Sequence, residues 1–314
     1  MTKYLLKRLG ETVIIIVLVS VITFFLVSIM PKDPVYALYG TDLTEAEYEA
    51  AYHTLNLDKP IIYRYWMWAK DFLTGNFGVS YRYHLPVTKL IGQKIGVTLY
   101  LSIVSTIISF PLGMLLGVIT AVKRGKWQDS VLTMLANLTA SLPGFVIAIV
   151  LLYLFSIHWK LLPATGFTFP WDDFGKHIRQ IIMPLFCLSL GGIAGVCRQT
   201  RSSMLEAIRQ DYVRTARSKG LKENVIIKTH VLRNGLIPIV TLIGGRLAMM
   251  IGGSVFIENV FSIPGMGTLM IQAVNDVDVP VMQACVMLSA AVICLAYLIT
   301  DFLYVVVDPR ISLK

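Results

Sequence analysis

Apolar stretches of membrane-spanning length recur along this chain of 314 residues and limit what it can fold into. A transmembrane α-helix needs about 20 consecutive, predominantly apolar residues. More than half of the residues (55%) are hydrophobic, and stretches of this length return at intervals. The predicted spans are residues 10–30, 97–122, 130–157, 181–197, 237–257 and 281–307. We therefore predict an all-α membrane protein with six transmembrane helices.

The distribution of basic residues predicts the orientation of these helices. Lysine and arginine accumulate in the cytoplasmic loops of membrane proteins. If the amino terminus is cytoplasmic, the inner segments hold most of the 28 Lys and Arg residues, whereas the last outer loop, residues 258–280, holds none. We predict that both termini are cytoplasmic. The net charge of +9 follows from this distribution and does not indicate binding to nucleic acid.

Residues 31–96, called the external region below, are polar and rich in aromatic side chains. Thr44 and Glu47 have the spacing of a helix capping box, and Pro60 suits the first turn of a further helix. We expect a helical and loop region between the first two spans. The predicted parts of the chain are an uncleaved amino-terminal transmembrane helix (1–30), the external region (31–96) and a five-helix core (97–314).

The sequence contains no catalytic or nucleotide-binding motif of the common kinds. Its five histidines form no HExxH pattern, and neither GxSxG nor GxxxxGK[ST] is present. The four cysteines lie singly in apolar segments, which favours a role as small hydrophobic residues over redox or metal binding. We predict that the chain is not an enzyme and binds no metal or cofactor. Any use of ATP would require a nucleotide-binding partner subunit.

Residues 198–236, called the basic loop below, form the longest polar segment in the second half of the chain. They carry nine lysines and arginines. A connection between membrane helices needs only a few residues, so a longer, structured loop favours a docking surface for another protein. The alternative is a solvated loop that faces lipid headgroups, which the positive-inside rule also predicts.

The pattern within the basic loop predicts two short helices with a tight corner. Apolar residues between Met204 and Ala216 share one face of a helix that extends to Lys219, where a cation suits the helix dipole. Gly220 then occupies the position where helices end in a left-handed conformation. A second helical segment is expected from about Asn224 to Asn234.

Ionisable residues inside the membrane usually mark a functional site. Arg246 lies about nine residues into the fifth predicted span, and Asp301 lies about six residues before the end of the sixth, both at the predicted cytoplasmic side. We hypothesise that they are neighbours or both face an aqueous pathway. A pair that only joins two helices is the alternative. Glu258, at the start of the predicted re-entrant loop 258–280, is a third candidate for the pathway.

Several motifs resemble those of a known family, and their order and spacing are more specific than any one of them. They are Asp33-Pro34, LNLDKP (55–60), GNFGVS (75–80), DYVRTARSKGL (211–221), HVLRN (230–234), Glu258, Phe261, PGMG (264–267) and DPR (308–310). Over nearly its whole length the chain resembles the permease subunits of bacterial ATP-binding-cassette importers for peptides, nickel and related solutes. More narrowly, it is similar to the first permease of the dipeptide and oligopeptide pair.

The resemblance places the Glu-Ala-Ala motif of this family on the basic loop. Arg214, Thr215 and Ala216 occupy its three positions, and only Ala216 and the later Gly220 match. The implied site for coupling to an ATPase is Asp211, Tyr212, Arg214, Thr215, Ala216, Arg217, Lys219 and Gly220. The small Ala216 and Gly220 are expected to let a groove of the ATPase approach the backbone.

The resemblance also implies partners and a location. The expected partners are a second permease subunit in a heterodimer, two ATPase subunits that carry ATP and magnesium, an external solute-binding protein and membrane lipid. The expected location is the bacterial inner membrane, and a dipeptide, an oligopeptide, glutathione or a nickel complex would fit equally well as solute. An ion-coupled carrier or channel without an ATPase is the alternative function.

Overall fold

The structure, a computed structural model, describes residues 2–30, 33–236, 239, 245 and 254–307. Its named elements are α1 (Thr2–Ser28), α2 (Pro34–Tyr39), α3 (Glu45–Thr54), α4 (Ile61–Leu73), α5 (Val87–Val122), α6 (Trp127–Ser141), α7 (Gly144–Leu151), η1 (Leu152–His158), α8 (Phe174–Ile208), α9 (Asp211–Ser218), α10 (Glu223–Val225), η2 (Ile226–Val231), α11 (Leu232–Gly235), α14 (Met266–Asp276) and α15 (Val279–Val307). Residues 254–260 are helical too. The all-α prediction is confirmed for the described residues.

Four helices, α1, α5, α8 and α15, are long and apolar enough to cross a membrane. A fifth candidate is the pair of α6 with α7 and η1, which is bent by 97°. The predicted span over 130–157 is therefore broken, and its crossing of the membrane stays a prediction. Pro143 explains the bend, because its ring prevents a straight helix and disfavours helical geometry at Leu142, which is extended (ψ 127°).

The predicted fifth span, residues 237–257, lies largely outside the described residues, so the count of six spans stays a prediction. Two other spans are longer than predicted. Helix α5 begins at Val87, directly after Pro86, and α8 extends the predicted span 181–197 in both directions. The side chain of Asp173 caps α8 by accepting a hydrogen bond from the Lys176 amide (2.9 Å).

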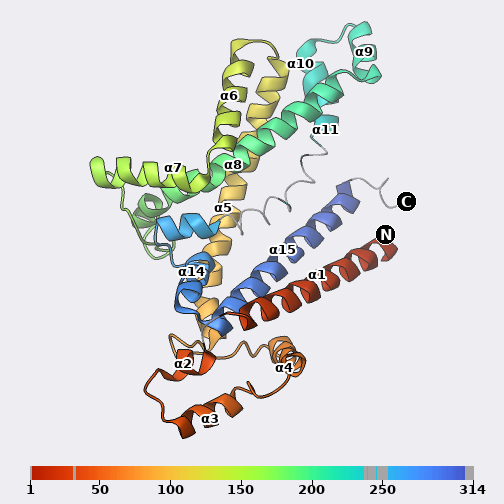
Figure 1. The fold of residues 1–314 in the computed structure, drawn as a ribbon. Helices are drawn as coiled ribbons and strands as arrows, with labels where there is room; N and C mark the ends of the chain where they lie inside the picture. The colour runs from red at the N-terminus through yellow and green to blue at the C-terminus, as the bar shows by residue number, and fades with distance from the viewer. Residues whose placement is uncertain (1, 31–32, 237–238, 240–244, 246–253, 308–314) are drawn as a thin grey trace.

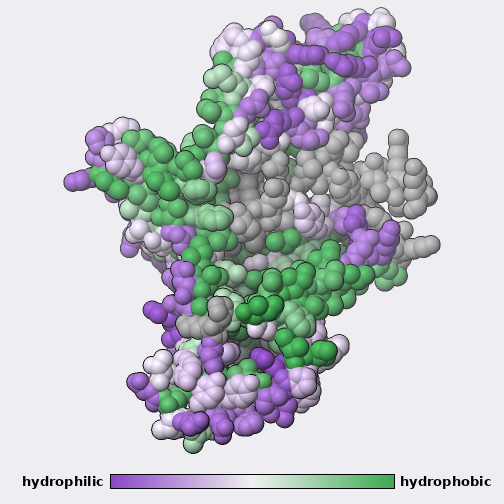
Figure 2. Space-filling view, viewed as in Figure 1, coloured by the Kyte–Doolittle hydropathy of each residue, from purple (hydrophilic) through white to green (hydrophobic). Residues whose placement is uncertain are grey.

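Helix α5 connects the two polar ends of the protein (Figure 1). The external region lies at the start of α5, and helices α9 to α11 lie near its other end, while α1 and α15 run side by side. Figure 2 shows a hydrophobic surface between hydrophilic ends at α3 and α9. Apolar side chains along α1, such as Ile14 (61% exposed) and Ile22 (55% exposed), face outward in this band. Such a band is what a lipid environment requires.

Helix α5 packs closely against α8 because two of its glycines leave room for the neighbouring helix. A Cβ atom at Gly113 would lie 2.7 Å from Val196 Cβ, and one at Gly117 would lie 2.5 Å from Thr200 Cβ. On α8, Gly191 is exposed and has no atom within 4 Å of its ideal Cβ position, so it takes no part in this contact.

The external region has its predicted helices and is hydrogen-bonded to the rest of the chain. Thr44 and Glu47 form the expected capping box at the start of α3, and α4 begins at Ile61, directly after Pro60. The Ser80 hydroxyl donates to the buried Asp278 carboxylate (2.5 Å), just before α15. The external region is therefore anchored to the beginning of the last span.

Candidate functional site

The basic loop is structured over residues 198–236, as predicted, but its first helix is divided. Helix α8 ends at Ile208, and α9 begins at Asp211 after an extended residue, Gln210 (φ −72°, ψ 152°). The prediction of a single helix from Met204 to Lys219 is therefore wrong, since Met204 belongs to the end of the long helix α8. No glycine or proline marks this break in the sequence.

Gly220 forms the predicted corner. Its φ is +74°, in the left-handed region, and no atom lies within 4 Å of its ideal Cβ position. The constraint on this residue is therefore its backbone conformation. The segment beyond the corner is helical from Glu223 to Gly235, as expected. Across the corner, Arg217 donates two hydrogen bonds to Glu223, from Nε (3.2 Å) and from a terminal nitrogen (2.7 Å).

The inner face of α9 is part of a small hydrophobic core. Val213 (0% exposed) and Ala216 (5% exposed) are its two buried residues. They belong to one buried cluster with Ala121 of α5, Met204 of α8 and residues of η2. The expectation that Ala216 lets a partner approach the backbone is corrected, because its methyl group packs inward. Its small size instead lets α9 lie close to the ends of α5 and α8.

The outer face of α9 is exposed and has a net positive charge. Six of the predicted coupling residues have exposed side chains: Asp211, Tyr212, Arg214, Thr215, Arg217 and Lys219. Arg214 contacts Asp211 at 3.8 Å, and both side chains are more than 80% exposed, so this ion pair contributes little to stability. The outer face therefore offers cations and hydrogen-bond donors on a helix whose other face is fixed.

A nearly buried ion pair joins this part of α8 to the beginning of α6. Arg201 donates to both carboxylate oxygens of Asp129, from Nε (2.9 Å) and from a terminal nitrogen (3.0 Å). The Gly125 amide (3.1 Å) and the Thr133 hydroxyl (3.2 Å) also donate to Asp129. The Asp129 side chain is only 9% exposed. Sequence reasoning missed this pair, because its residues are 72 positions apart.

The predicted pathway residues do not form one group among the described residues. Asp301 forms an ion pair with Arg8 of α1 (3.2 Å), which also contacts Glu11 (3.1 Å). Arg246 lies outside the described residues, so its proximity to Asp301 is untested. Asp301 is therefore engaged in a contact between α1 and α15, and a role in a solute pathway stays a prediction.

Glu258 is fully buried and connects three parts of the chain. Its carboxylate accepts hydrogen bonds from Thr98 Oγ1 of α5 (2.7 Å), Ser254 Oγ (3.0 Å) and the Gly267 amide of α14 (2.7 Å). Thr98 Oγ1 also accepts from the Met266 amide (2.8 Å). We call these residues the Glu258 cluster. The PGMG motif thus has a structural explanation, since a Cβ atom at Gly267 would overlap Glu258 and Val255.

The described residues contain no group of three or more His, Cys, Asp or Glu side chains arranged to hold a metal ion. Two buried carboxylates are instead satisfied by nearby donors, Asp129 by Arg201 and Glu258 by the Glu258 cluster. Within this part of the chain, the basic loop is the strongest candidate site, because it combines an ordered fold with an exposed charged face.

The Arg217–Glu223 pair makes the corner sensitive to acid. The hydrogen bonds from Arg217 hold the pKa of Glu223 below its ordinary value of 4.5. A lowered pKa means that the pair stabilises the fold fully above pH 4.5 and loses this effect as the pH falls through the lowered pKa. We expect Glu223→Gln to cost up to about 1 kcal/mol at pH 7, because the pair is exposed.

Thermal unfolding of the purified chain at pH 7 and at pH 3.5 would measure this effect. The difference between Glu223→Gln and the unmodified chain should shrink at the lower pH. Glu206→Gln is the control, because Glu206 is an exposed carboxylate of α8 with no ion pair among the described residues. Equal effects of the two variants at both pH values would contradict a role for the pair.

Comparison with known proteins agrees with these features. Residues 113–313 match the family described as binding-protein-dependent transport system inner membrane component, and residues 1–102 match its amino-terminal counterpart. A putative peptide permease protein of Brucella ovis is 38% identical over 99% of both chains. The dipeptide transport system permease protein of Lactococcus lactis is 37% identical over the full length of both.

The fold is also similar to a solved structure. A chain of the MetNI methionine ABC transporter, in an inward-facing conformation, aligns with a TM-score of 0.57 and 18% identity over 70% of this chain and 96% of its own length. At this identity the likeness supports the fold alone. The two family matches together span nearly the whole sequence. The chain therefore belongs to the binding-protein-dependent transport system inner membrane components, multi-pass proteins of the bacterial cell membrane.

Proposed function

We propose that this chain is a permease subunit of an ATP-binding-cassette importer and that it forms half of a pathway for peptides or a related small solute. Relatives that match its full length are described as peptide or dipeptide permeases, which supports this solute class. The other half of the pathway would come from a second permease subunit. The solute would be delivered by an external binding protein, as the family description implies.

The observation that carries this proposal is the two-sided construction of α9. Its inner residues, Val213 and Ala216, are buried with the ends of α5 and α8, whereas its outer face is exposed and basic. A solvated connection would not need a buried core of its own. A helix that is fixed on one side and open on the other is suited to receive a protein partner and to transmit its movement.

The partner of α9 would be an ATPase subunit, and two such subunits would bind ATP and magnesium. The permease itself would then need no catalytic group. Closure of the ATPases would move α9, and the shared core would carry this movement into α5 and α8. The Asp129–Arg201 pair would carry it further into α6. The pathway would open alternately to the two sides of the membrane.

This function requires the α9 end to be cytoplasmic. We propose six spans with both termini on that side, in which residues 237–257 supply the span that is largely outside the described part of the chain. The external region then projects from the opposite membrane surface, where a binding protein would arrive. The hydrophobic band between two hydrophilic ends supports this arrangement (Figure 2).

Substitution of Gly220 by arginine tests the proposal. The left-handed conformation is about 1–2 kcal/mol less favourable for a residue with a Cβ atom than for glycine. The arginine would also project from the corner beside the docking face. We expect copurification of the ATPase subunits to fall at least about tenfold, with a matching loss of ATP-dependent uptake in vesicles.

Gly75→Arg is the matched control, because Gly75 follows the end of α4 as Gly220 follows α9, has a φ of +84°, has no atom within 4 Å of its ideal Cβ position and lies in the external region. This variant should keep its ATPase subunits. If Gly220→Arg retains both the ATPase subunits and uptake, α9 is not the coupling helix. A chain that never associates with an ATPase would overturn the proposed function itself.

A further inference from the structure

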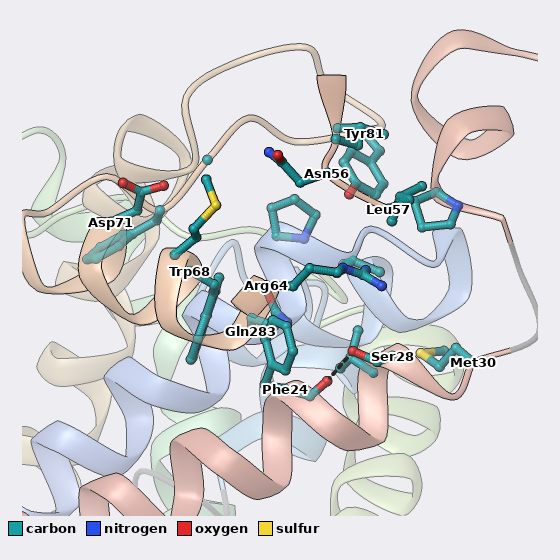
Figure 3. Close-up of a pocket in the computed structure, with 18 of the residues that line it drawn as sticks. Phe24, Ser28, Met30, Asn56, Leu57, Arg64, Trp68, Asp71, Tyr81 and Gln283 are labelled. Carbon is teal, nitrogen blue, oxygen red and sulfur yellow. Dashed lines mark hydrogen bonds between the residues drawn. The ribbon is translucent and has the colours of Figure 1, made fainter. Parts of the chain in front are cut away.

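A cavity of about 580 Å³ lies between the external region and the ends of two membrane helices. Its walls come from α1, α4 and the start of α15, together with the loops after α3 and α4 (Figure 3). The proposed docking face on α9 lies at the opposite end of the protein (Figure 1). The cavity therefore requires an explanation separate from coupling to an ATPase.

The sequence builds this cavity from one face of each of two helices. Helix α4 contributes Arg64, Met67, Trp68 and Asp71, at spacings of three and four residues, and α1 contributes Phe24, Val27 and Ser28 in the same way. Ring contacts hold the two helices together, with the centroids of Phe24 and Trp68 5.4 Å apart. These two faces therefore place aromatic and apolar side chains beside the charged groups of Arg64 and Asp71.

Arg64 is the cation of this cavity. Its side chain is half-buried and extends into the space between Tyr81, Leu57 and Gln283 (Figure 3). Within the described part of the chain, its guanidinium group has no ion pair and donates no hydrogen bond. Five N–H donors in a fixed planar arrangement are thus available on one side chain. A partly buried arginine without an anion is unusual, because burial of an unpaired charge is costly.

The two carboxylates of the cavity do not supply the missing anion. Asp33 accepts hydrogen bonds from the Val35 amide (2.8 Å) and from the Tyr48 hydroxyl (2.5 Å). Asp71 is exposed and lies toward the other end of the cavity from Arg64 (Figure 3). An anion from outside this chain would therefore meet little competition at the guanidinium group.

Tyr81 adds a second hydrogen-bond donor beside Arg64. Its ring lies above the Arg64 guanidinium group in the cavity (Figure 3). Burial, together with the negative charge of Asp278, raises the pKa of Tyr81 to about 12. The hydroxyl is therefore protonated at neutral pH and is able to donate to an anion. Gln283 of α15 offers a further amide group at the same place.

We propose that this cavity binds an anionic group that is attached to an apolar moiety, with Arg64 as its principal ligand. The anion, a phosphate or a carboxylate, would accept hydrogen bonds from Arg64, and the apolar part would lie against Phe24, Trp68 and neighbouring side chains. The cavity stands at the membrane surface, where α1 ends and α15 begins. Two kinds of molecule carry such a group to the membrane surface: an anionic lipid, through its headgroup, and a solute with a free carboxylate.

Native mass spectrometry of the full-length chain in detergent tests the proposal with two pairs of probes. The lipid pair is dioleoyl phosphatidylglycerol, which is anionic, and dioleoyl phosphatidylcholine, which carries no net charge. The solute pair is the dipeptide Ala-Phe and its carboxy-terminal amide. In at least one pair, the first-named probe should be retained more strongly than its partner, and Arg64→Gln should reduce its binding about tenfold, as expected for loss of a charge-assisted hydrogen bond.

Lys70→Gln is the matched control, because it removes the same charge from an exposed position on α4 outside the cavity. It should leave binding unchanged, and Arg64→Lys should retain part of it. If Arg64→Gln weakens the binding of phosphatidylglycerol only, the cavity is a lipid site. If it weakens the binding of Ala-Phe only, the cavity is a solute site. If Arg64→Gln elutes as a folded protein and binds both phosphatidylglycerol and Ala-Phe as the unmodified chain does, the proposal is wrong.

Discussion

Replacement of Arg201 by methionine is expected to destabilise the protein by about 3–5 kcal/mol, because it leaves a nearly buried carboxylate without its cation. Asp129 is only 9% exposed, and both of its oxygens accept hydrogen bonds from Arg201. The Gly125 and Thr133 donors remain but carry no charge. The midpoint of thermal unfolding of the purified chain should fall clearly.

The same variant separates stability from coupling. In the proposed importer, loss of the pair would disconnect α6 from the end of α8, so the remaining folded complexes should hydrolyse more ATP per solute taken up. The double variant Asp129→Leu/Arg201→Met should recover most of the stability, since an apolar pair often replaces a buried ion pair without loss. It should still hydrolyse more ATP per solute taken up than the unmodified protein, because the ion pair between α6 and α8 is absent.

Arg198→Met is the control for Arg201→Met. Arg198 lies on the same helix one turn earlier and is exposed. Its replacement should leave the unfolding midpoint within the error of the measurement, as is usual for exposed positions. If Arg201→Met unfolds at the same temperature as Arg198→Met, the Asp129–Arg201 pair contributes nothing to the stability of this region.

Replacement of Gly117 by alanine is expected to disrupt the contact between α5 and α8. The new methyl group would lie 2.5 Å from Thr200 Cβ and 2.7 Å from the carbonyl oxygen of Cys197. A carbonyl group within a helix cannot rotate away as a flexible side chain would, so the helices must separate. Overpacking of this kind typically costs about 1–3 kcal/mol, and the yield of folded protein in detergent should fall accordingly.

Gly191→Ala provides the comparison on the facing helix, because no atom lies within 4 Å of the new methyl group. Alanine also has the higher helix propensity, so this variant should be neutral or slightly stabilising. The addition of Thr200→Gly to Gly117→Ala should restore only part of the yield, since the Cys197 carbonyl group remains. Full folding of Gly117→Ala alone would show that the two helices tolerate a wider separation.

Features that depend on local sequence were predicted well. The apolar stretches located α1, α5 and α15, and the spacing of Thr44 and Glu47 located the start of α3. The left-handed corner at Gly220 followed from its position after a helical pattern. Each of these depends on neighbours within one or two turns, where periodicity and capping rules apply directly.

Features that depend on tertiary contacts were not predicted. The break at Gln210 has no glycine or proline to signal it, and it arises where α9 turns to place Val213 in the core with Met204. The inward direction of Ala216 has the same cause. The pairing of Asp129 with Arg201 and of Glu258 with Thr98 could not be found by pattern alone, since the partners lie 72 and 160 positions apart.

The Glu258 cluster also has a consequence for how the chain is made. Its first member, Thr98, is synthesised long before Ser254 and Gly267, and one Thr98 hydroxyl contacts both Glu258 and the Met266 amide. The buried Glu258 carboxylate therefore acquires all its donors only when residues 254–267 have been made and lie against α5. A chain that ends before residue 267 would lack the Gly267 amide and would leave the buried carboxylate without one of its donors.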